Sequence, residues 1–584
     1  MKLFDFTLPS GGQQPLLYFR TEGQYSLSEG ALAFCGAVSF DTYFNCFSYS
    51  KYLKHTKVEN IKVRIQIKGE ATAQLRLCAY SKEKEENIID KELASIKINA
   101  YKKTTHYIEC DLAFLNGFNH SCGFIYLKLL SDSECVFYGG GYESEIADVN
   151  TVKVGMVICT YKREESVKAN TAKLKELLNE IEAFVVDNGG TLNESELNGA
   201  TLIKNRNLGG SGGFTRGIVE VVKRGGFTHF LLSDDDIFFN LETLKKTINI
   251  LRVAKNPEKL VVGASMIRSD NMTLQHELGA KWKGSKVYAN NHNFDLTERA
   301  FLLANETEKD ADYTGWWWAC MPVAFAEKFG LPLPLFIKHD DVEYSLRCDK
   351  ELMLVNGIGV WHEPFENKYN PSLEYYIKRN ELIVSSLYDK DFFKCAVKKL
   401  FASVGKQLIF QRYFAIRYIY KAYSDFLKGA KFLLDSDPEE LNAVLRKDDF
   451  CLLSKDELNA KGYATDSFYK EDKNNSLPLS RALTLNGYLI PKVFYDKSPY
   501  RVVDMRDPKI GQFHKAAKVV QYNPSTGQGF ITEIKKGEMV KHAFKTLCVF
   551  IKFIFKAKAA KRSYKKSFSR LTSFENWEKL FNKV

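Results

Sequence analysis

The 584-residue chain lacks the sequence marks of several common protein classes. No Cys-x-x-Cys pair occurs among its twelve cysteines, which are therefore predicted to be reduced, mostly buried thiols of a cytosolic protein. Neither the Gly-x-Gly-x-x-Gly fingerprint of dinucleotide-binding proteins nor a phosphate-binding loop ending in Gly-Lys-Ser/Thr is present. These absences disfavour hydride transfer and phosphoryl transfer as functions.

The sequence also has no segment with the length and composition of a membrane span. The N-terminal residues contain no apolar stretch of the kind found in signal peptides. The longest apolar run near the end, Leu547–Phe555, has nine residues and includes Lys552, whereas a spanning helix needs about 20. We therefore expect neither a signal peptide nor a helix that crosses the bilayer.

The overall composition is that of a globular protein. Hydrophobic residues make up 45% of the chain and charged residues 26%, which argues against a disordered, collagenous or multi-span membrane protein. At about 150 residues per domain, the length predicts about three or four domains. The net charge is +12, but ten lysines and arginines and no acid lie between Glu538 and Glu575. The chain therefore has a basic tail on a nearly neutral body.

The basic tail has the pattern of an amphipathic helix. Apolar residues recur at helical spacing, and lysines follow most of them by one position; the apolar set is Val540, Phe544, Leu547, Ile551 and Phe555. Such a helix is suited to lying on anionic lipid, so residues 540–584 are predicted to contact the inner-membrane surface. The alternative is a helix packed on the core with one solvated face. Nucleic acid is not expected as a partner, because no DNA- or RNA-binding module is recognisable.

Three regions follow one another along the chain. Residues 1–148 alternate apolar and polar positions, as from Ile61 to Ile67, and predict an antiparallel β-sandwich. Residues 149–385 alternate apolar strands with helix-like stretches, which is typical of a mostly parallel, doubly wound α/β sheet. Residues 386–584 are predicted to be a helical C-terminal region with an irregular stretch near 474–508 and the basic tail.

Polar clusters end four of the strands predicted in the middle region. They are Thr160–Arg163, Asp187–Gly189, Asn205–Leu208 and Asp234–Asp236. In doubly wound sheets, ligands bind beyond the carboxyl ends of the strands. The sequence therefore predicts one binding site at this edge.

Asp234, Asp235 and Asp236 are the candidates for metal binding in this site. Carboxylates at alternate positions of an extended tip point the same way, so the first and third can share a divalent cation. His362, at the end of the apolar strand 358–360, would complete the site. The alternatives are a solvated acidic turn and a histidine satisfied in the core.

Three further clusters carry candidate chemistry. The glycine-rich stretch 207–217 would let backbone N–H groups approach phosphates, or would be only a flexible turn. At least one indole of Trp316–Trp318 is expected to face a groove as a platform for a sugar; the alternative is a buried packing cluster. One carboxylate of the Asp340–Asp341 pair would act as a general base, and the pair would also fit the first turn of a helix.

The order of these clusters is more specific than any one of them. The series is TYKR, VVDNG, NLGGSGGFTRG, LLSDDD, TGWWW, IKHDDVEYSLR and GVWHEP. It resembles the inverting, metal-dependent GT-A glycosyltransferases of family 2, and within them the polymerising galactofuranosyltransferases that build mycobacterial galactan. The resemblance is strong over residues 151–380 and loose elsewhere. It implies a GT-A, Rossmann-like core between the β-sandwich and the helical region.

The resemblance also implies roles for individual residues. Asp234, Asp236 and His362 match the ligands of Mn²⁺ (or Mg²⁺), and Asp341 matches the general base. The positions that match the nucleotide-sugar site are Thr160, Arg163, Asp187, Asn207, Gly209 and Asp235. The positions that match the acceptor site are Glu277, Trp316, Trp317, Lys338 and Asp340. One departure is His339, where the family commonly has a tryptophan before its aspartate pair.

By resemblance, the expected enzyme moves galactofuranose from UDP-galactofuranose to a hydroxyl of a lipid-linked cell-surface glycan. It would lie on the cytoplasmic face of the membrane, and the sequence leaves open whether it forms a homo-oligomer. Two alternatives remain. One is a transferase of the same fold that uses UDP-galactopyranose or a deoxysugar nucleotide. The other is a non-catalytic glycan-binding protein.

Overall fold

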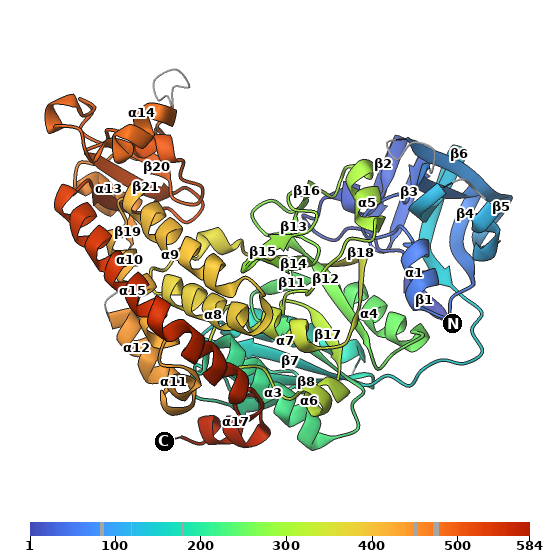
Figure 1. The fold of residues 1–584 in the computed structure, drawn as a ribbon. Coiled ribbons are helices and arrows are strands. Elements are labelled where there is room, and N and C mark those ends of the chain that lie inside the picture. The colour runs from blue at the N-terminus through green and yellow to red at the C-terminus, as the bar shows by residue number, and fades with distance from the viewer. Residues whose placement is uncertain (82–86, 118–119, 178, 448–451, 471–477, 584) are drawn as a thin grey trace. The chain divides into compact units, whose positions relative to one another are not determined.

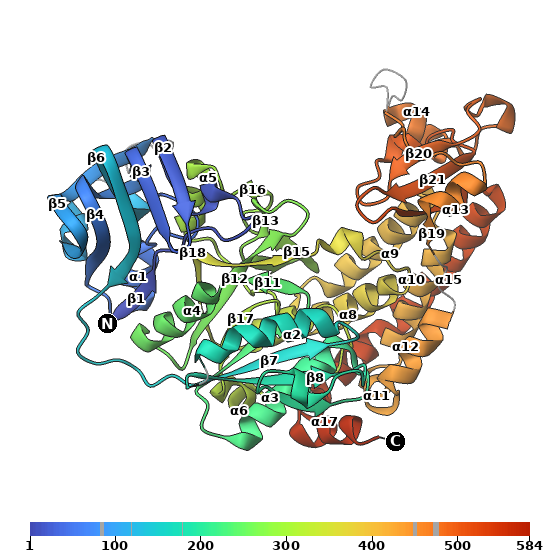
Figure 2. The same ribbon diagram turned by 180° about the vertical axis from the view of Figure 1, so that it is seen from behind.

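The computed structural model describes residues 1–81, 87–117, 120–177, 179–447, 452–470 and 478–583. The chain folds into two compact units, drawn from two sides in Figures 1 and 2. The first unit contains Met1–Trp282, Val287–Pro332 and Asp341–Glu363. The second contains Lys283–Lys286, Leu333–Asp340 and Pro364–Val584. The division of the sequence into three regions, with boundaries after residues 148 and 385, stays a prediction.

An antiparallel sheet begins the first unit. Its strand order is β2 (Arg20–Ser28), β3 (Ala31–Ser39), β6 (His120–Glu143), β4 (Asn60–Ser81) and β5 (Ile88–Asp111), and β1 (Lys2–Asp5) also pairs with β6. The antiparallel pairing agrees with the sequence pattern, and alternate residues of β4 such as Ile61 and Val63 are buried. Hydrogen bonds join all six strands into one sheet, and its packing as a two-layer sandwich stays a prediction. The longest strands have 22 to 24 residues and are interrupted by register shifts, which bend a strand locally.

A ten-stranded mixed sheet forms the centre of the first unit. Its main order is β11 (Ile237–Phe239), β18 (Glu351–His362), β12 (Leu260–Arg268), β17 (Ala319–Pro322), β10 (His229–Asp234), β7 (Val154–Thr160), β8 (Ile181–Asp187) and β9 (Thr201–Lys204). Strands β13 (Leu274–Glu277) and β16 (Phe294–Asp295) extend it, and β14 (Ala280–Lys283) and β15 (Lys286–Ala289) form a separate pair. Pairing is parallel from β10 through β7 and β8 to β9, as predicted, and also between β12 and β18.

Helices connect the strands of this central sheet. They are α2 (Glu164–Lys173), α3 (Gly209–Arg224), α4 (Leu241–Val253), α5 (Arg299–Glu306), α6 (Ala324–Phe329) and α7 (Asp340–Arg347). Because β7 and β8 are buried on both faces, their sequences are nearly continuous apolar runs. The first unit therefore has the mixed α/β core that the sequence predicts.

Buried polar contacts join the segment between β3 and β4 to helix α5 and strand β18 of the central region. Ser48, just before α1 (Tyr49–His55), donates a 2.8 Å hydrogen bond to the buried carboxylate of Glu306. Lys51 donates to the carbonyl of Asn305 at 2.6 Å, and the Tyr43 hydroxyl donates to the carbonyl of Ile358 at 3.0 Å. A buried charge is tolerated only where it is hydrogen-bonded, so these contacts hold the 43–51 segment to the central region within the unit.

The second unit is mainly helical. Its helices are α8 (Leu373–Tyr388), α9 (Phe392–Ile409), α10 (Tyr413–Phe426), α11 (Ala430–Asp435), α12 (Pro438–Lys447), α13 (Lys455–Ala460), α14 (Pro478–Leu483), α15 (Lys536–Lys566), α16 (Phe568–Leu571) and α17 (Phe574–Phe581). Helix α15, orange-red to red in Figure 1, is the long basic helix expected from the tail sequence. Among the described residues, no helix combines the length and apolarity that a membrane crossing requires.

A small sheet, which the sequence did not predict, lies within this largely helical unit. Its order is β19 (Leu453–Ser454), β22 (Gln528–Glu533), β21 (Lys518–Asn523) and β20 (Arg501–Asp504). Strands of two to six residues are too short to show a clear alternating pattern in the sequence. Part of the expected irregular stretch, 474–477, lies outside the described residues; the rest contains α14, short helical turns and β20.

Candidate functional site

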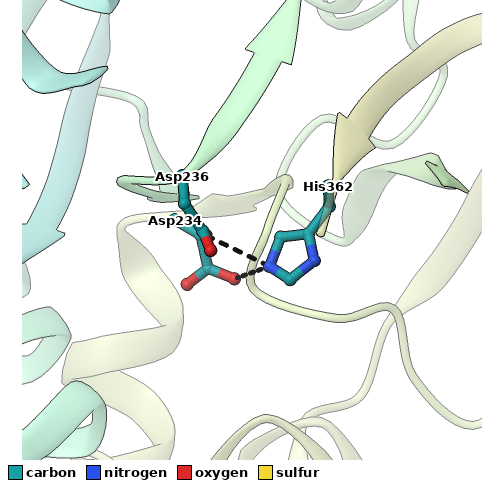
Figure 3. Close-up of side chains that lie close together, drawn as sticks. All are labelled: Asp234, Asp236 and His362. Carbon is teal, nitrogen blue, oxygen red and sulfur yellow. Dashed lines mark ion pairs between the residues drawn. The ribbon is translucent and has the colours of Figure 1, made fainter. Parts of the chain in front are cut away.

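Three candidate metal ligands meet at one edge of the central sheet. Asp234 ends β10, Asp236 follows in the turn to β11, and His362 ends β18. The pairing of β11 with β18 places Ile237 opposite His362, which brings the histidine to the acidic turn. The Nε2 atom of His362 lies 3.2 Å from Asp236 Oδ1 and 3.4 Å from Asp234 Oδ2 (Figure 3). The structure thus brings together the three residues that the sequence singles out.

The electrostatics of this cluster suit a cation. Burial alone would lower the pKa of His362, but hydrogen bonds and the charges of Asp234 and Asp236 raise it to about 9. The imidazole therefore holds a proton between two carboxylates when no other cation is there. One ligand atom from each residue lies within 4.8 Å of the others. Two carboxylate oxygens and an imidazole nitrogen at this spacing fit a divalent cation that would replace the proton.

The middle acid of the triplet is held by the end of β7. The Thr160 hydroxyl donates a 2.8 Å hydrogen bond to Asp235 Oδ2, and the backbone N–H of Tyr161 donates to the same oxygen at 3.3 Å. Burial and the charge of Asp236 raise the pKa of Asp235 to about 6. Residues at the end of the neighbouring strand therefore fix Asp235 beside the three candidate metal ligands.

Arg163 also contacts the acidic turn. Its Nη1 atom lies 2.9 Å from Asp236 Oδ2, and its Nε atom lies 3.9 Å from Asp235 Oδ1. The side chain is 40% exposed, so the guanidinium stays accessible to a ligand while it pairs with the carboxylates. Thr160, Arg163, Asp235 and Asp236 form one connected group, as the motif order predicts.

Asp187 organises the turn after β8. Its Oδ1 accepts hydrogen bonds from the backbone N–H groups of Gly189 and Gly190, at 2.8 and 2.9 Å. Its Oδ2 accepts from Thr191 and Leu192 at the same two distances. A carboxylate has about four acceptor positions, and this one is only 1% exposed. The structure therefore shows Asp187 shaping the turn; the sequence had suggested only a nucleotide contact.

The glycine-rich stretch starts α3 and packs it against β7. A Cβ on Gly217 would lie 2.1 Å from Val157 Cγ1, and one on Gly213 would lie 2.1 Å from Cys159 Sγ. Gly209 has a φ of +69°, which glycine adopts without strain, and its N–H donates to the side chain of Asn207 at 3.2 Å. Close helix–strand packing thus explains Gly213 and Gly217, while Asn207 and Gly209 shape the start of the helix.

The three indoles are more covered than the sequence led us to expect. Trp316, Trp317 and Trp318 are 4%, 5% and 0% exposed. Each has different partners: Trp316 packs edge-on against Phe214, Trp317 donates to the carbonyl of Ala264, and Trp318 donates to Thr247. Consecutive indoles thus reach separate parts of the core. The centre of the Trp317 ring also lies 6.4 Å from that of His362, one of the three candidate metal ligands.

The negative charges of Glu277 and Asp341 both affect the pKa of the Tyr313 phenol. Burial raises the pKa of Tyr313, and the charges of Glu277 and Asp341 raise it further. Asp341 lies in the first turn of α7, where its Oδ1 accepts a 2.8 Å hydrogen bond from the N–H of Val342. The helix-start reading of the Asp340–Asp341 pair is therefore confirmed.

The loop before α7 has an unusual backbone. Phe336, Lys338 and His339 have φ values of 71°, 70° and 67°, in the left-handed region that bulky residues seldom adopt. Asn380 of α8 is fully buried and its side-chain amide donates to the carbonyls of Leu335, Ile337 and Lys338 at 3.1, 2.8 and 2.9 Å. These hydrogen bonds hold the loop that carries Lys338 and Asp340.

Arg379, beside Asn380, donates to the carbonyl of Leu335 at 2.7 Å. It is 2% exposed. Sequence reasoning missed both residues. The available signal was the polar run Lys378–Glu381 in the middle of the helix, between mostly apolar segments.

No family model matches the chain. Two curated proteins named galactofuranosyltransferase GlfT2 are similar to it. The one from Mycolicibacterium smegmatis is 27% identical over 441 residues, which cover 70% of this chain and 65% of that protein. The one from Mycobacterium tuberculosis is 26% identical over 436 residues, which cover 68% and 66%. The resemblance indicated by the motifs is confirmed, and this chain spans slightly less than two thirds of the length of these relatives.

Solved structures give weaker matches. The mannosyltransferase PcManGT from Pyrobaculum calidifontis, in complex with GDP-Man and Mn²⁺, aligns with a TM-score of 0.28 and 11% identity over 51% of this chain and 82% of that one. TarS from S. aureus aligns with a TM-score of 0.30 and 13% identity over 55% of this chain and 57% of that one.

Proposed function

We propose that this protein is an inverting, metal-dependent glycosyltransferase that moves galactofuranose from UDP-galactofuranose to a hydroxyl of a lipid-linked cell-surface glycan. The observation that carries the proposal is the convergence of Asp234, Asp236 and His362 at the sheet edge. The likeness to proteins named galactofuranosyltransferase supports the choice of donor. The donor, acceptor and stereochemistry are parts of the proposal.

The donor would bind at the acidic turn and the strand ends beside it. Bound to Asp234, Asp236 and His362, Mn²⁺ or Mg²⁺ would neutralise the negative charge of the diphosphate. Arg163 would pair with a phosphate oxygen through its exposed guanidinium. Thr160 and Asp235 would fix the turn against the nucleotide. Asp187, Asn207 and Gly209 would shape the neighbouring strand ends, Asp187 through its four hydrogen bonds to the 188–192 turn.

Asp341 would act as the general base. A sugar hydroxyl is a poor nucleophile, so a carboxylate must take its proton as the oxygen attacks the anomeric carbon. UDP leaves from the opposite face, which inverts the configuration and needs no covalent intermediate with the enzyme. Glu277, Trp316, Trp317, Lys338 and Asp340 would surround the acceptor. Trp316 and Trp317 are 4% and 5% exposed, so neither would offer a sugar a broad open ring face.

UDP release tests the proposal directly. The purified chain is incubated with a panel of sugar nucleotides and a lipid-linked galactose-containing acceptor, with Mn²⁺ and with EDTA. Turnover with UDP-galactofuranose alone, lost in EDTA, is expected. Turnover with UDP-galactopyranose or a deoxysugar nucleotide would show that the proposed donor is wrong and that the proposed reaction class is right. If no donor turns over, and neither UDP nor Mn²⁺ binds, the glycan-binding alternative gains support.

Variants of one acid separate catalysis from folding. Asp341→Asn is expected to lower transfer by at least about 100-fold while nucleotide binding and thermal stability stay unchanged, because general-base catalysis contributes about 10²–10⁴ in rate. The matched control is Asp132→Asn, which changes an exposed acid of β6 that is not among the candidate site residues. Near-normal turnover by a folded Asp341→Asn variant would show that Asp341 is not the general base.

We also propose that the protein works at the cytoplasmic face of the membrane and contacts it through residues 540–584. Helix α15 buries one side, including Phe553, Ala557 and Tyr564. Its other side exposes the predicted apolar set: Val540 (65%), Phe544 (70%), Leu547 (47%), Ile551 (45%) and Phe555 (80%). Lysines flank these residues. The helix is thus packed on the second unit and still presents an amphipathic basic surface.

Substitution is a cleaner test of this surface than deletion, because deletion would also remove the packed side. Phe544→Ser combined with Phe555→Ser is expected to weaken binding to vesicles of phosphatidylglycerol and phosphatidylcholine. Unchanged binding to the vesicles would show that the exposed apolar side of α15 is not the membrane contact. Whether the protein forms a homo-oligomer is checked by light scattering of the same samples.

A further inference from the structure

Residues 483–494 form a second exposed apolar surface in the second unit, here called the apolar loop. Its large exposed side chains are Leu483 (69%), Leu485 (51%), Leu489 (56%), Val493 (81%) and Phe494 (63%). Ile510, 49% exposed, lies beside it, because its carbonyl accepts a 3.2 Å hydrogen bond from the side chain of Asn486. So many large apolar side chains gathered on one surface mark an interaction site.

Two polar side chains of the apolar loop point inward. Asn486 and Tyr488 are 5% and 4% exposed, whereas their apolar neighbours face outward. The Tyr488 hydroxyl donates a 2.7 Å hydrogen bond to the carbonyl of Leu408, which fixes the loop to α9. The backbone turns sharply at Leu485 and Asn486, with φ values of 46° and 56°. The outward placement of the apolar side chains is therefore imposed by internal hydrogen bonds.

The apolar loop also lies against the start of α15. The hydroxyls of Tyr488 and Tyr413 are 2.5 Å apart, and the N–H of Lys535 donates to the Tyr413 hydroxyl at 2.9 Å. Lys536 in turn donates from Nζ to the carbonyl of Ile490 at 2.5 Å. The exposed apolar side of α15 begins at Val540, about one helical turn further on. The loop and the helix thus place two apolar surfaces next to each other.

The charges around the loop favour an anionic surface. Residues 478–495 contain Arg481 and Lys492 and no acid. The adjoining helix contributes its lysines, with no acid after Glu538 until Glu575. Apolar side chains that project beyond neighbouring cations match a bilayer with anionic headgroups, because the side chains reach the acyl region while the cations stay at the headgroups.

We propose that the apolar loop inserts Leu489, Val493 and Phe494 into the acyl region of an anionic bilayer, as a second anchor beside α15. This inference rests on the proposed membrane contact of the protein and adds to it a specific inserting segment. Together the two elements would hold the second unit at a fixed depth, since two separate anchors restrict tilting more than one helix does. A lipid-linked acceptor would then reach the enzyme from the same surface.

A tryptophan placed at the loop tip tests insertion. The six native tryptophans are at most 7% exposed, so they give a nearly constant background. In the full-length Phe494→Trp variant, emission is expected to shift to shorter wavelength with phosphatidylglycerol–phosphatidylcholine vesicles and to be quenched by brominated acyl chains. The matched control is Tyr101→Trp, at an 89% exposed aromatic position on β5, which is expected to show neither effect.

Vesicle sedimentation of the same proteins separates the two levels of the proposal. If the Phe494→Trp variant sediments with vesicles but its introduced indole is not quenched, the inserting loop is wrong and the membrane contact stands. If nothing sediments, both are wrong. If the emission shifts with protein concentration in the absence of lipid, the apolar loop is a face for self-association and the inference is overturned. Leu489→Ser, Val493→Ser and Phe494→Ser combined are expected to weaken vesicle binding at least about tenfold.

Discussion

Replacing Asp187 with asparagine would distinguish a structural carboxylate from one that contacts the nucleotide. The carboxylate accepts four backbone hydrogen bonds, two at each oxygen. An asparagine keeps one oxygen and turns the other position into an NH₂ donor that faces two N–H groups. The substitution therefore removes two hydrogen bonds to a charged group without changing the size of the side chain.

The expected cost follows from those two hydrogen bonds. A hydrogen bond to a charged group contributes about 1.5–3 kcal/mol, so the loss is about 3–6 kcal/mol for the turn after β8. Because Asp187 is only 1% exposed, water cannot replace the lost acceptor without opening the turn. We expect Asp187→Asn to lower the midpoint of thermal unfolding by several degrees, and the amides of residues 189–192 to exchange faster.

Thermal unfolding, hydrogen–deuterium exchange and UDP titration together provide the readout, with Asp132→Asn as the control at an exposed acid. Loss of stability with a smaller loss of UDP affinity supports the structural role. An unchanged unfolding midpoint and unchanged exchange, with UDP binding abolished, would refute the reasoning. That result would mean that the carboxylate serves the ligand and that the turn does not depend on it.

Three further predictions concern packing, the loop before α7 and pH. Gly217→Ala places a Cβ 2.1 Å from a methyl group of Val157 and is expected to lower the free energy of unfolding, measured with denaturant, by about 1–3 kcal/mol. The control Gly210→Ala, whose Cβ would have nothing within 4 Å, is expected to lower it far less. Equal effects of the two substitutions would contradict the packing argument. Asn380→Ala removes the amide that donates to the carbonyls of Leu335, Ile337 and Lys338, while Leu335 keeps its hydrogen bond from Arg379. Acceptor KM is therefore expected to rise while UDP affinity stays unchanged, and parallel losses of both would point to general unfolding. Burial lowers the pKa of His229 from 6.5 to about 4. Its contribution to the free energy of unfolding is therefore complete above pH 6.5, where the imidazole is neutral in the folded and the unfolded chain. About 3 kcal/mol of that free energy is lost as pH falls from 6.5 to about 4. His229→Gln is expected to flatten this part of the pH–stability profile, and an unchanged slope would show that other groups cause it.

Much of the site could be predicted from local sequence. An apolar run that ends in a polar cluster predicts a buried strand and also says which end of it meets the ligand. Asp234, Asp236, Thr160 and Arg163 follow this rule, and they lie together in the structure. His362 was found for the same reason, since it closes an apolar strand.

Other features depend on contacts that no local pattern records. Asn380 was missed because its partners are carbonyls of the loop before α7, and a carbonyl is present at every residue. Strand β19 of the second unit was missed because its partner is distant in the sequence, with Leu453 opposite Gly529. The glycines of α3 suggested phosphate binding, whereas two of them face side chains of β7.

The sequence by itself determined the parallel core, the edge at which the site lies and the chemical type of its residues. The periodicity of apolar residues sets the strands, and the chain direction sets the end at which their polar tips meet. Only the tertiary structure decided which roles those residues are free to play. Asp187 is occupied by four N–H groups and the three indoles are covered, because hydrogen bonds and packing between distant segments use these groups first.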